Sequence, residues 1–273
     1  MVNLRAGMRR VYHEHIPKKF KRRVVHIGRR VAFNLERLIN RELPSSVNVE
    51  TNSACNRTCY YCPRPSERTE LEEGLFYSVV DQLKDWGFRG RFTPVGYNEP
   101  LTDKRIFRFI SYARQASPHF HIMLVTNGDF LDERVMDSLI QAGVDEVLVT
   151  IHNPSKTDKI NELNILRSMY HNMILQDLRE GHRVSPLNNK GGLVTLERSE
   201  PVPACYAIDT LNIRADGSVV LCCQDSMKQN VFGNIKNSPI REIWKDTAFV
   251  RIRNGTAKGV YELGICQRCE YEI

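Results

Sequence analysis

The sequence lacks the marks of a secreted or membrane-spanning protein. No apolar run approaches the roughly 20 residues that a transmembrane helix needs, and the N-terminus is too highly charged for a signal peptide. There is also no Gly-x-Gly-x-x-Gly fingerprint that would indicate a nicotinamide cofactor. We therefore expect a cytoplasmic protein. Its eight cysteines then indicate metal ligation and not disulfides, because reducing compartments keep thiols free.

The composition is that of a globular protein whose charge is unevenly placed. With 273 residues, 41% hydrophobic and 26% charged, the chain is long enough for one large domain or two unequal ones. Residues 1–44 carry twelve Lys and Arg against three Glu, a net charge of +9. Because the whole chain has a net charge of +7, residues 45–273 have a net charge of −2. The weak charge of the main body argues against nucleic acid as its partner.

The basic N-terminal segment has the pattern of an amphipathic helix. After Pro17, apolar residues recur at steps of three and four, namely at Val24, Ile27, Val31, Leu35 and Leu38. Such a helix can pack on the main domain with its basic face in water, or it can bind a membrane surface or another anionic partner. Pro44-Ser45-Ser46 reads as a break, so we expect a helical extension over residues 1–45.

Three cysteines lie on one short loop directly after a strand-like run, residues 47–52. They are Cys55, Cys59 and Cys62. Three thiolates so close together indicate a metal site. A closed structural zinc site needs four protein ligands, so the trio suits better an iron-sulfur cluster with one iron left open to a small molecule. A zinc loop remains the alternative.

The rest of the first two thirds alternates between strand and helix patterns. Strands are predicted over residues 91–97, 119–125 and 146–151, and helices over 70–86, 104–115, 132–142 and about 155–180, with 182–187 as a fifth strand. Repeated strand-helix units predict a parallel sheet that right-handed crossovers curl into an open barrel. Active sites of such barrels lie at the carboxyl ends of the strands. The cysteine loop, Glu99, Asn127 and His152 all fall at those ends.

The spacing Cys-x3-Cys-x2-Cys, with Tyr61 before the third cysteine, resembles the signature of the radical S-adenosylmethionine (SAM) enzymes. The resemblance implies a partial, truncated TIM-like α/β barrel over residues 46–190. It also implies a [4Fe-4S] cluster on Cys55, Cys59 and Cys62 whose open iron binds SAM. In that family, SAM is reduced to a 5′-deoxyadenosyl radical that abstracts a hydrogen atom from the substrate, with flavodoxin or ferredoxin as the electron donor.

The same resemblance suggests which residues contact SAM. In the family the second strand usually ends Gly-Gly-Glu-Pro, and here residues 96–100 read Gly-Tyr-Asn-Glu-Pro, one residue longer. Glu99 would hold the SAM ammonium, Thr126 and Asn127 match the polar end of the third strand, and Tyr61 and His152 would contact the cofactor. A lone histidine at a strand end is more often structural, so a structural role is the competing interpretation of His152.

The C-terminal third resembles the auxiliary-cluster domain of radical SAM proteins, the "twitch" form related to SPASM domains. Five cysteines occur in the order of that domain, at Cys205, Cys222, Cys223, Cys266 and Cys269. The resemblance implies a small α+β domain over residues 191–273 that binds a second [4Fe-4S] cluster. We also predict a hairpin turning at Asp216-Gly217 and a helix over 239–251. A structural zinc site is the other interpretation of these cysteines.

One of the eight cysteines is left over. The family pattern Gly-x4-Cys, counted from Gly217, selects Cys222 as the fourth ligand beside Cys205, Cys266 and Cys269. Neighbouring side chains on a strand point to opposite faces, so Cys223 would then be spare. It would be either a small hydrophobic residue or a catalytic thiol that donates a hydrogen atom to a substrate radical, as in some radical SAM epimerases.

The resemblance is greatest to the carbohydrate-modifying dehydrogenases and epimerases of the family. We therefore expect a radical SAM oxidoreductase or epimerase that acts on a C-H bond of a sugar, cyclitol or similar small polar metabolite. Arg183, Asn188 and Asn189 are candidates for holding its hydroxyls. Two alternatives stay open: a maturase for a ribosomally made peptide, and a zinc-stabilised protein whose basic N-terminal helix binds nucleic acid.

Overall fold

The computed structural model describes residues 42–273 except 65, 153–156, 180–181, 183–185, 204 and 206. The predicted N-terminal helix lies outside the described residues. Residues 42–273 form one compact unit. The proposed division of this unit after residue 190 stays a prediction.

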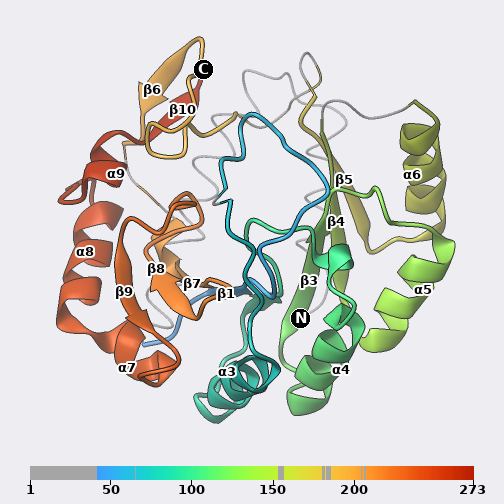
Figure 1. Cartoon of the computed structure of the whole chain (residues 1–273), viewed down its shortest axis with the longest axis horizontal. Helices are drawn as coiled ribbons and strands as arrows, with labels where there is room; N and C mark the ends of the chain where they lie inside the picture. The colour runs from blue at the N-terminus through green and yellow to red at the C-terminus, as the bar shows by residue number, and fades with distance from the viewer. Residues whose placement is uncertain are drawn as a thin grey trace, which may run out of the picture. The chain divides into compact units, whose positions relative to one another are not determined.

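The centre of the unit is an eight-stranded sheet in the order β5-β4-β3-β2-β1-β7-β8-β9 (Figure 1). Its first five strands are parallel, and β7 pairs with β1 in the same direction. The strands are β1 Ser46–Val49, β2 Arg91–Thr93, β3 His121–Thr126, β4 Glu146–Ile151, β5 Met173–Asp177, β7 Thr210–Ile213, β8 Ser218–Val220 and β9 Val231–Asn234. Among the described residues β5 and β9 do not pair with each other, so the sheet is open, as the prediction of a partial α/β barrel requires.

Helices cover the outside of the sheet (Figure 1). They are α3 Glu73–Asp85, α4 Ile106–Ala116, α5 Glu133–Ala142, α6 Thr157–Met169, α7 Ile240–Lys245, α8 Thr247–Ala257 and α9 Gly264–Gln267, with 3-10 turns η1 Pro100–Thr102 and η2 Ala207–Asp209. Buried aromatic rings join the layers. Phe76 of α3 stacks on Phe109 of α4 with 4.1 Å between ring centroids and packs edge-on against Phe92 of β2 at 6.0 Å. Large apolar rings packed in this way contribute much of the burial free energy of a core.

Local sequence signals explain where α5 begins and ends. The Asp132 carboxylate accepts a hydrogen bond from the Val135 N–H at 2.8 Å, which satisfies a free backbone donor in the first turn. Gly143 follows the helix with φ 104°, a left-handed conformation that glycine adopts without a steric cost.

The C-terminal third continues the sheet of the first part. β7 pairs with β1 over four residues, and β7 and β8 form the predicted hairpin, in which Gly217 has φ 86°. A second, two-stranded sheet joins β6 Ser199–Pro201 and β10 Glu270–Glu272. The pairing of β1 with β7 joins the C-terminal third to the central sheet, and the Cys223 carbonyl accepts a hydrogen bond from Tyr97, which follows β2.

Two predicted helices were wrong in extent. The pattern over 155–180 is a helix only to Met169, because the apolar run that follows pairs with the free edge of β4, with Val147 opposite Met173 and Ile151 opposite Asp177. The fifth strand therefore comes earlier than residues 182–187, of which 183–185 lie outside the described part. The helix predicted over 239–251 is two helices, because Asp246 is extended and caps α8 by accepting from the Phe249 N–H.

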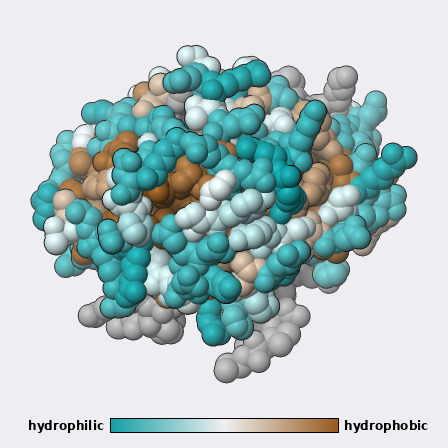
Figure 2. Space-filling view, turned by 60° about the horizontal axis from the view of Figure 1, so that its bottom comes forward, coloured by the Kyte–Doolittle hydropathy of each residue, from teal (hydrophilic) through white to brown (hydrophobic). Residues whose placement is uncertain are grey.

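The surface is mostly polar. The face in Figure 2 is largely hydrophilic, with smaller hydrophobic areas between the polar side chains. Within the described part of the chain, no helix combines the length and the apolar character needed to cross a membrane.

Candidate active site

The loop that follows β1 holds the three cysteines of the first motif close together. The Cys62 N–H donates to the Cys59 carbonyl at 3.0 Å, and the Arg57 N–H points at the Cys55 sulfur at 3.5 Å. All three thiols are partly buried. Burial raises the pKa of the Cys59 and Cys62 thiols, and the neighbouring cysteines raise it further. Thiolates that repel one another in this way are stabilised by a bound cationic metal, which deprotonates its cysteine ligands.

Three of the predicted cofactor contacts converge at the ends of β2 and β3. Glu99 is 2% exposed, and one carboxylate oxygen accepts from the Thr126 hydroxyl at 2.7 Å and from the Leu101 N–H at 3.1 Å. Its other oxygen accepts from the Asn127 N–H at 2.7 Å. Burial raises the pKa of Glu99, although these three hydrogen bonds partly offset the effect. The result is a buried carboxylate that a cationic group would stabilise.

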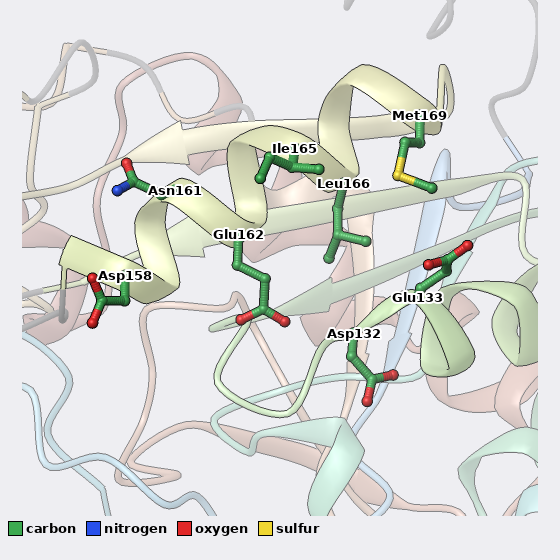
Figure 3. Close-up of a pocket in the computed structure, with 8 residues that line it drawn as sticks. All are labelled: Asp132, Glu133, Asp158, Asn161, Glu162, Ile165, Leu166 and Met169. Atoms are coloured by element: carbon green, nitrogen blue, oxygen red, sulfur yellow. The ribbon is translucent and has the colours of Figure 1, made fainter.

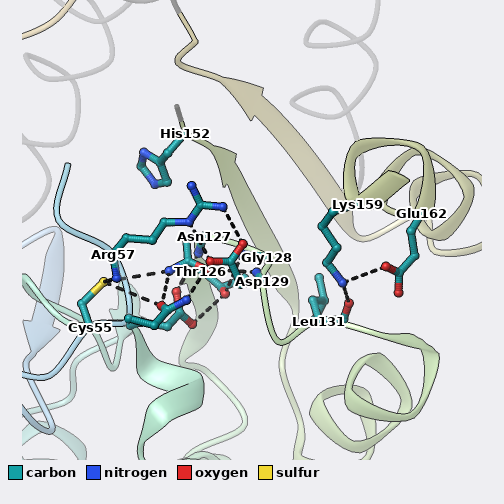
Figure 4. Close-up of polar contacts among 12 residues, drawn as sticks. Cys55, Arg57, Thr126, Asn127, Gly128, Asp129, Leu131, His152, Lys159 and Glu162 are labelled. Atoms are coloured by element: carbon teal, nitrogen blue, oxygen red, sulfur yellow. Dashed lines mark hydrogen bonds and ion pairs between the residues drawn. The ribbon is translucent and has the colours of Figure 1, made fainter. Parts of the chain in front are cut away.

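A polar network joins the cysteine loop to the end of β3 (Figure 4). The Asn127 amide donates to the Asn56 side-chain oxygen at 2.8 Å, and the Asn56 amide donates to Asp129 at 2.7 Å. Arg57 pairs with both oxygens of Asp129, at 2.7 and 2.5 Å. Sequence analysis missed Arg57 and Asp129. Their signal was an arginine inside the cysteine motif and a carboxylate two residues after Asn127.

Tyr61 and His152 contact each other. The Tyr61 hydroxyl oxygen lies 2.5 Å from Nδ1 of His152, which directly follows β4. Burial lowers the pKa of His152 to about 4, so the ring is neutral at physiological pH and Nδ1 can accept the hydroxyl proton. The Tyr61 ring packs on Leu187 and Val194. The tyrosine of the motif thus ties the cysteine loop to β4 and to the C-terminal part of the chain.

The C-terminal cysteines form a second group, drawn from three separate segments. Cys222 and Cys266 are buried, Cys205 and Cys269 are partly buried, and Cys223 is exposed. Burial raises the pKa of Cys222, and the charges of Cys223, Cys205 and Cys266 raise it further. The Asn188 amide donates to the Cys269 sulfur at 3.2 Å. This grouping supports Cys222 as a ligand beside Cys205, Cys266 and Cys269, an assignment that stays a prediction.

Tyr97 lies between the two groups of cysteines. Its hydroxyl donates to the Cys223 carbonyl at 2.6 Å, and its ring is 8% exposed. Burial raises the pKa of Tyr97, and the charges of Cys223, Cys62 and Cys222 raise it further, so both groups act on one phenol. Sequence analysis did not single out Tyr97. It lies in the stretch of residues 96–100 that is one residue longer than the family pattern.

Asn188 and Asn189 have structural roles, contrary to the suggestion that they hold substrate hydroxyls. Both are buried. The Asn188 amide donates to the Cys269 sulfur and to the Glu270 carbonyl, and the Asn189 amide donates to the Arg268 carbonyl at 2.8 Å. The two amides therefore fix the segment around Cys269. Arg183 lies outside the described residues.

Two protein-family models match the chain. The radical SAM superfamily model matches residues 49–181, and the model of the SPASM iron-sulfur cluster-binding domain matches residues 205–270. This chain is a radical SAM enzyme. The matched ranges contain both cysteine groups described above.

Among its relatives, the radical SAM enzyme is similar over almost its whole length to a dehydrogenase. It is 29% identical to the S-adenosyl-L-methionine-dependent 2-deoxy-scyllo-inosamine dehydrogenase of Niallia circulans, over 84% of this chain and 93% of that protein. It is 26% identical to the PqqA peptide cyclase of Gluconobacter oxydans, over 40% of this chain and 31% of that protein.

Two solved structures of BtrN resemble the fold. The complex of BtrN with AdoMet and 2-DOIA has a TM-score of 0.75 and 27% identity, covering 83% of this chain and 93% of that one. BtrN in an open conformation has a TM-score of 0.63, covering 80% and 87%.

The radical SAM enzyme uses SAM, a [4Fe-4S] cluster that binds it, and an auxiliary iron-sulfur cluster. The described residues fit these groups. Within the described ranges, no three His, Cys, Asp or Glu side chains are close enough together to bind one metal ion. This spacing is compatible with a cluster, because each cysteine of a cluster site binds a different iron atom and the thiols therefore stand further apart. The two cysteine groups would hold the clusters, and the buried carboxylate of Glu99 suits the SAM ammonium.

A groove lies between α5 and α6, lined by none of the residues of this site (Figure 3). It has a volume of about 500 Å³ and is lined by Asp132, Glu133, Asp158, Asn161, Glu162, Ile165, Leu166 and Met169. None of these is a predicted site residue. Glu162 already pairs with Lys159 at 3.0 Å (Figure 4). The groove therefore belongs to the outer helix layer and not to the cysteine sites.

Proposed function

We propose that this radical SAM enzyme is a dehydrogenase that oxidises a secondary alcohol of a small cyclitol, aminocyclitol or sugar. The observation that carries the proposal is the similarity to a cyclitol dehydrogenase across nearly all of both chains, including both cysteine groups. The similarity to a peptide cyclase spans 40% of this chain, so a peptide substrate has weaker support.

The position of Tyr97 supports the same activity. Oxidation of an alcohol to a ketone removes two electrons and two protons. When bound, SAM and its cluster would supply a one-electron oxidant that takes the hydrogen atom on carbon, the auxiliary cluster would accept the second electron, and the hydroxyl proton would leave to water. The Tyr97 hydroxyl contacts the Cys223 carbonyl, and the charges of Cys62 and Cys222 also act on this phenol, so a small substrate beside Tyr97 would be near both groups.

The protein residues have distinct proposed roles. Glu99, with Thr126 and Asn127 fixing its carboxylate, binds the SAM ammonium. Tyr61 and His152 shape the cofactor site from the other side. A reductant of the flavodoxin or ferredoxin type supplies the electron that starts each turnover.

Epimerisation is the second candidate, and the exposure of Cys223 is the observation that favours it. In that reaction the Cys223 thiol would donate a hydrogen atom to the substrate radical from the opposite face, and an electron from the auxiliary cluster with a proton from water would return the resulting thiyl radical to the thiol. The product is then an isomer and not a ketone.

The test is a reaction of the reconstituted enzyme with a panel of cyclitols, aminocyclitols and hexoses deuterated at each alcohol carbon. Dehydrogenation predicts deuterium in 5′-deoxyadenosine and an equal amount of ketone. It also predicts that Cys223→Ala keeps the activity while Cys222→Ala loses it. An isomeric product without ketone, abolished by Cys223→Ala, would establish the epimerase instead, and turnover of peptides alone would overturn both.

A further inference from the structure

A buried ion pair joins the carboxyl ends of three parallel strands, β1, β2 and β7. Glu50, directly after β1, is 2% exposed, and its carboxylate accepts from the Tyr97 N–H at 2.8 Å and from the Ala215 N–H at 3.1 Å. Nε of Arg214, which directly follows β7, lies 3.2 Å from the same carboxylate. Two apolar side chains would avoid the cost of desolvating these charges, so the pair points to a use beyond stability.

The guanidinium of Arg214 also contacts the ring of Tyr97. Its central carbon lies 4.8 Å from the ring centroid, within the range of a cation–π contact. Both side chains are buried. On its far side, Nη2 of Arg214 donates to the Ser226 carbonyl at 3.4 Å. Tyr97 is therefore held at its backbone by Glu50 and at its ring by Arg214.

The chain around Tyr97 makes hydrogen bonds beside both cysteine groups. Toward the C-terminal group, the Tyr97 hydroxyl donates to the Cys223 carbonyl at 2.6 Å. Toward the first group, the N–H of Glu99, two residues after Tyr97, donates to the Ala54 carbonyl at 2.8 Å. Ala54 directly precedes Cys55. Residues 97–99 thus link the two groups, and the orientation of the Tyr97 ring determines where the link to Cys223 can form.

We propose that Arg214 is a positioning residue that acts through the Tyr97 ring to fix the distance between the two iron-sulfur clusters. The inference rests on the two clusters and not on the proposed substrate. Glu50 keeps the guanidinium against the ring, and the ring holds the segment that carries Cys222 and Cys223. Such precision matters for catalysis, since a displacement of about 1 Å in an active site can lower a rate roughly 100-fold.

The experiment measures the distance between the two clusters in the anaerobically reconstituted full chain, without substrate. Both clusters are reduced, and their magnetic dipolar interaction is recorded by pulsed electron paramagnetic resonance. The wild type should give one narrow distance distribution. Arg214→Gln should broaden it, and Arg214→Lys, which keeps the charge beside Glu50, should broaden it less. Arg114→Gln, which removes an ion pair with Asp145 at the amino end of β4, should leave it unchanged.

A second variant covers the case in which Arg214→Gln does not fold or bind both clusters. Tyr97→Phe keeps the ring and loses only the bond to the Cys223 carbonyl, and it should broaden the distribution by itself. Because Arg214 acts through this ring, adding Arg214→Lys to Tyr97→Phe should broaden the distribution no further. A wild-type distribution in Arg214→Gln or Tyr97→Phe, or additive broadening in the double variant, would overturn the proposal. Without substrate, these outcomes are independent of whether the enzyme is a dehydrogenase or an epimerase.

Discussion

The two cysteine groups are built in opposite ways. The first comes from one loop of eight residues, is partly exposed, and is held by polar contacts of Asn56 and Arg57 to Asp129. The second gathers cysteines from three segments, includes the buried Cys222 and Cys266, and depends on the pairing of β1 with β7. The first group is therefore largely a local structure, whereas the second belongs to the core.

This contrast predicts different consequences of removing each set of ligands. Alanine at Cys55, Cys59 and Cys62 together should remove about half of the bound iron and all SAM cleavage with little change in Tm. Alanine at Cys205, Cys266 and Cys269 should also remove about half of the iron but lower Tm strongly, because buried side chains and a cross-link between segments are lost. Iron analysis, 5′-deoxyadenosine formation and calorimetry measure the three effects. Equal losses of Tm in the two proteins would break the comparison.

Glu99→Gln tests the electrostatics of the first group. Loss of a charge-assisted contact of about 1.5–3 kcal/mol should weaken SAM binding by roughly 10- to 100-fold, measured by calorimetric titration. Glu72→Gln, at a carboxylate that is 68% exposed and pairs with Lys236, is the matched control and should change binding little.

The same variant should alter the pH dependence of stability. Because burial raises the pKa of Glu99 above 4.5, the stability contributed by its neutral form is complete below pH 4.5 and lost as the pH rises through the raised value. Without SAM, the wild-type free energy of unfolding should therefore fall relative to Glu99→Gln between pH 4.5 and neutral pH. Urea denaturation at both pH values measures this difference, and a relative gain by the wild type would contradict it.

A double-mutant cycle with Arg57→Ala and Asp129→Ala tests whether polar contacts stabilise the loop of the first cysteine group. The two side chains are only 15% and 24% exposed and pair through two hydrogen bonds, so a coupling of about 1 kcal/mol is expected in the free energy of unfolding. The pair Arg108 and Glu73, which is 60% and 37% exposed, is the control, with a coupling near zero. Similar couplings in both cycles would count against a special role for Asp129.

An effect no larger than this coupling is expected from Tyr61→Phe. It removes one partly buried hydrogen bond to His152 and should cost about 1 kcal/mol of stability. Tyr60→Phe, at a side chain that is 68% exposed, should cost less. If the two variants unfold at the same urea concentration, the contact between Tyr61 and His152 does not stabilise the loop.

The accuracy of the sequence-based predictions followed the range of the interactions involved. β4 and the turn at Asp216-Gly217 were correct because each depends on residues near in sequence. The strand Met173–Asp177 was read as helix, because a short apolar run fits either state until the edge of β4 selects one. Asn188 and Asn189 were read as substrate residues because nothing in the local sequence shows their bonds to residues about 80 positions later.

The sequence alone was sufficient to predict the radical SAM motif, the open α/β barrel and the meeting of Glu99, Thr126 and Asn127, since strand ends in a parallel sheet share one edge. Only the tertiary structure brought Tyr97 to the Cys223 carbonyl and tied Arg57 to Asp129. The physical reason is that spacing along the chain encodes local geometry. Contacts between distant segments depend on the pairing of β1 with β7, which no residue specifies by itself.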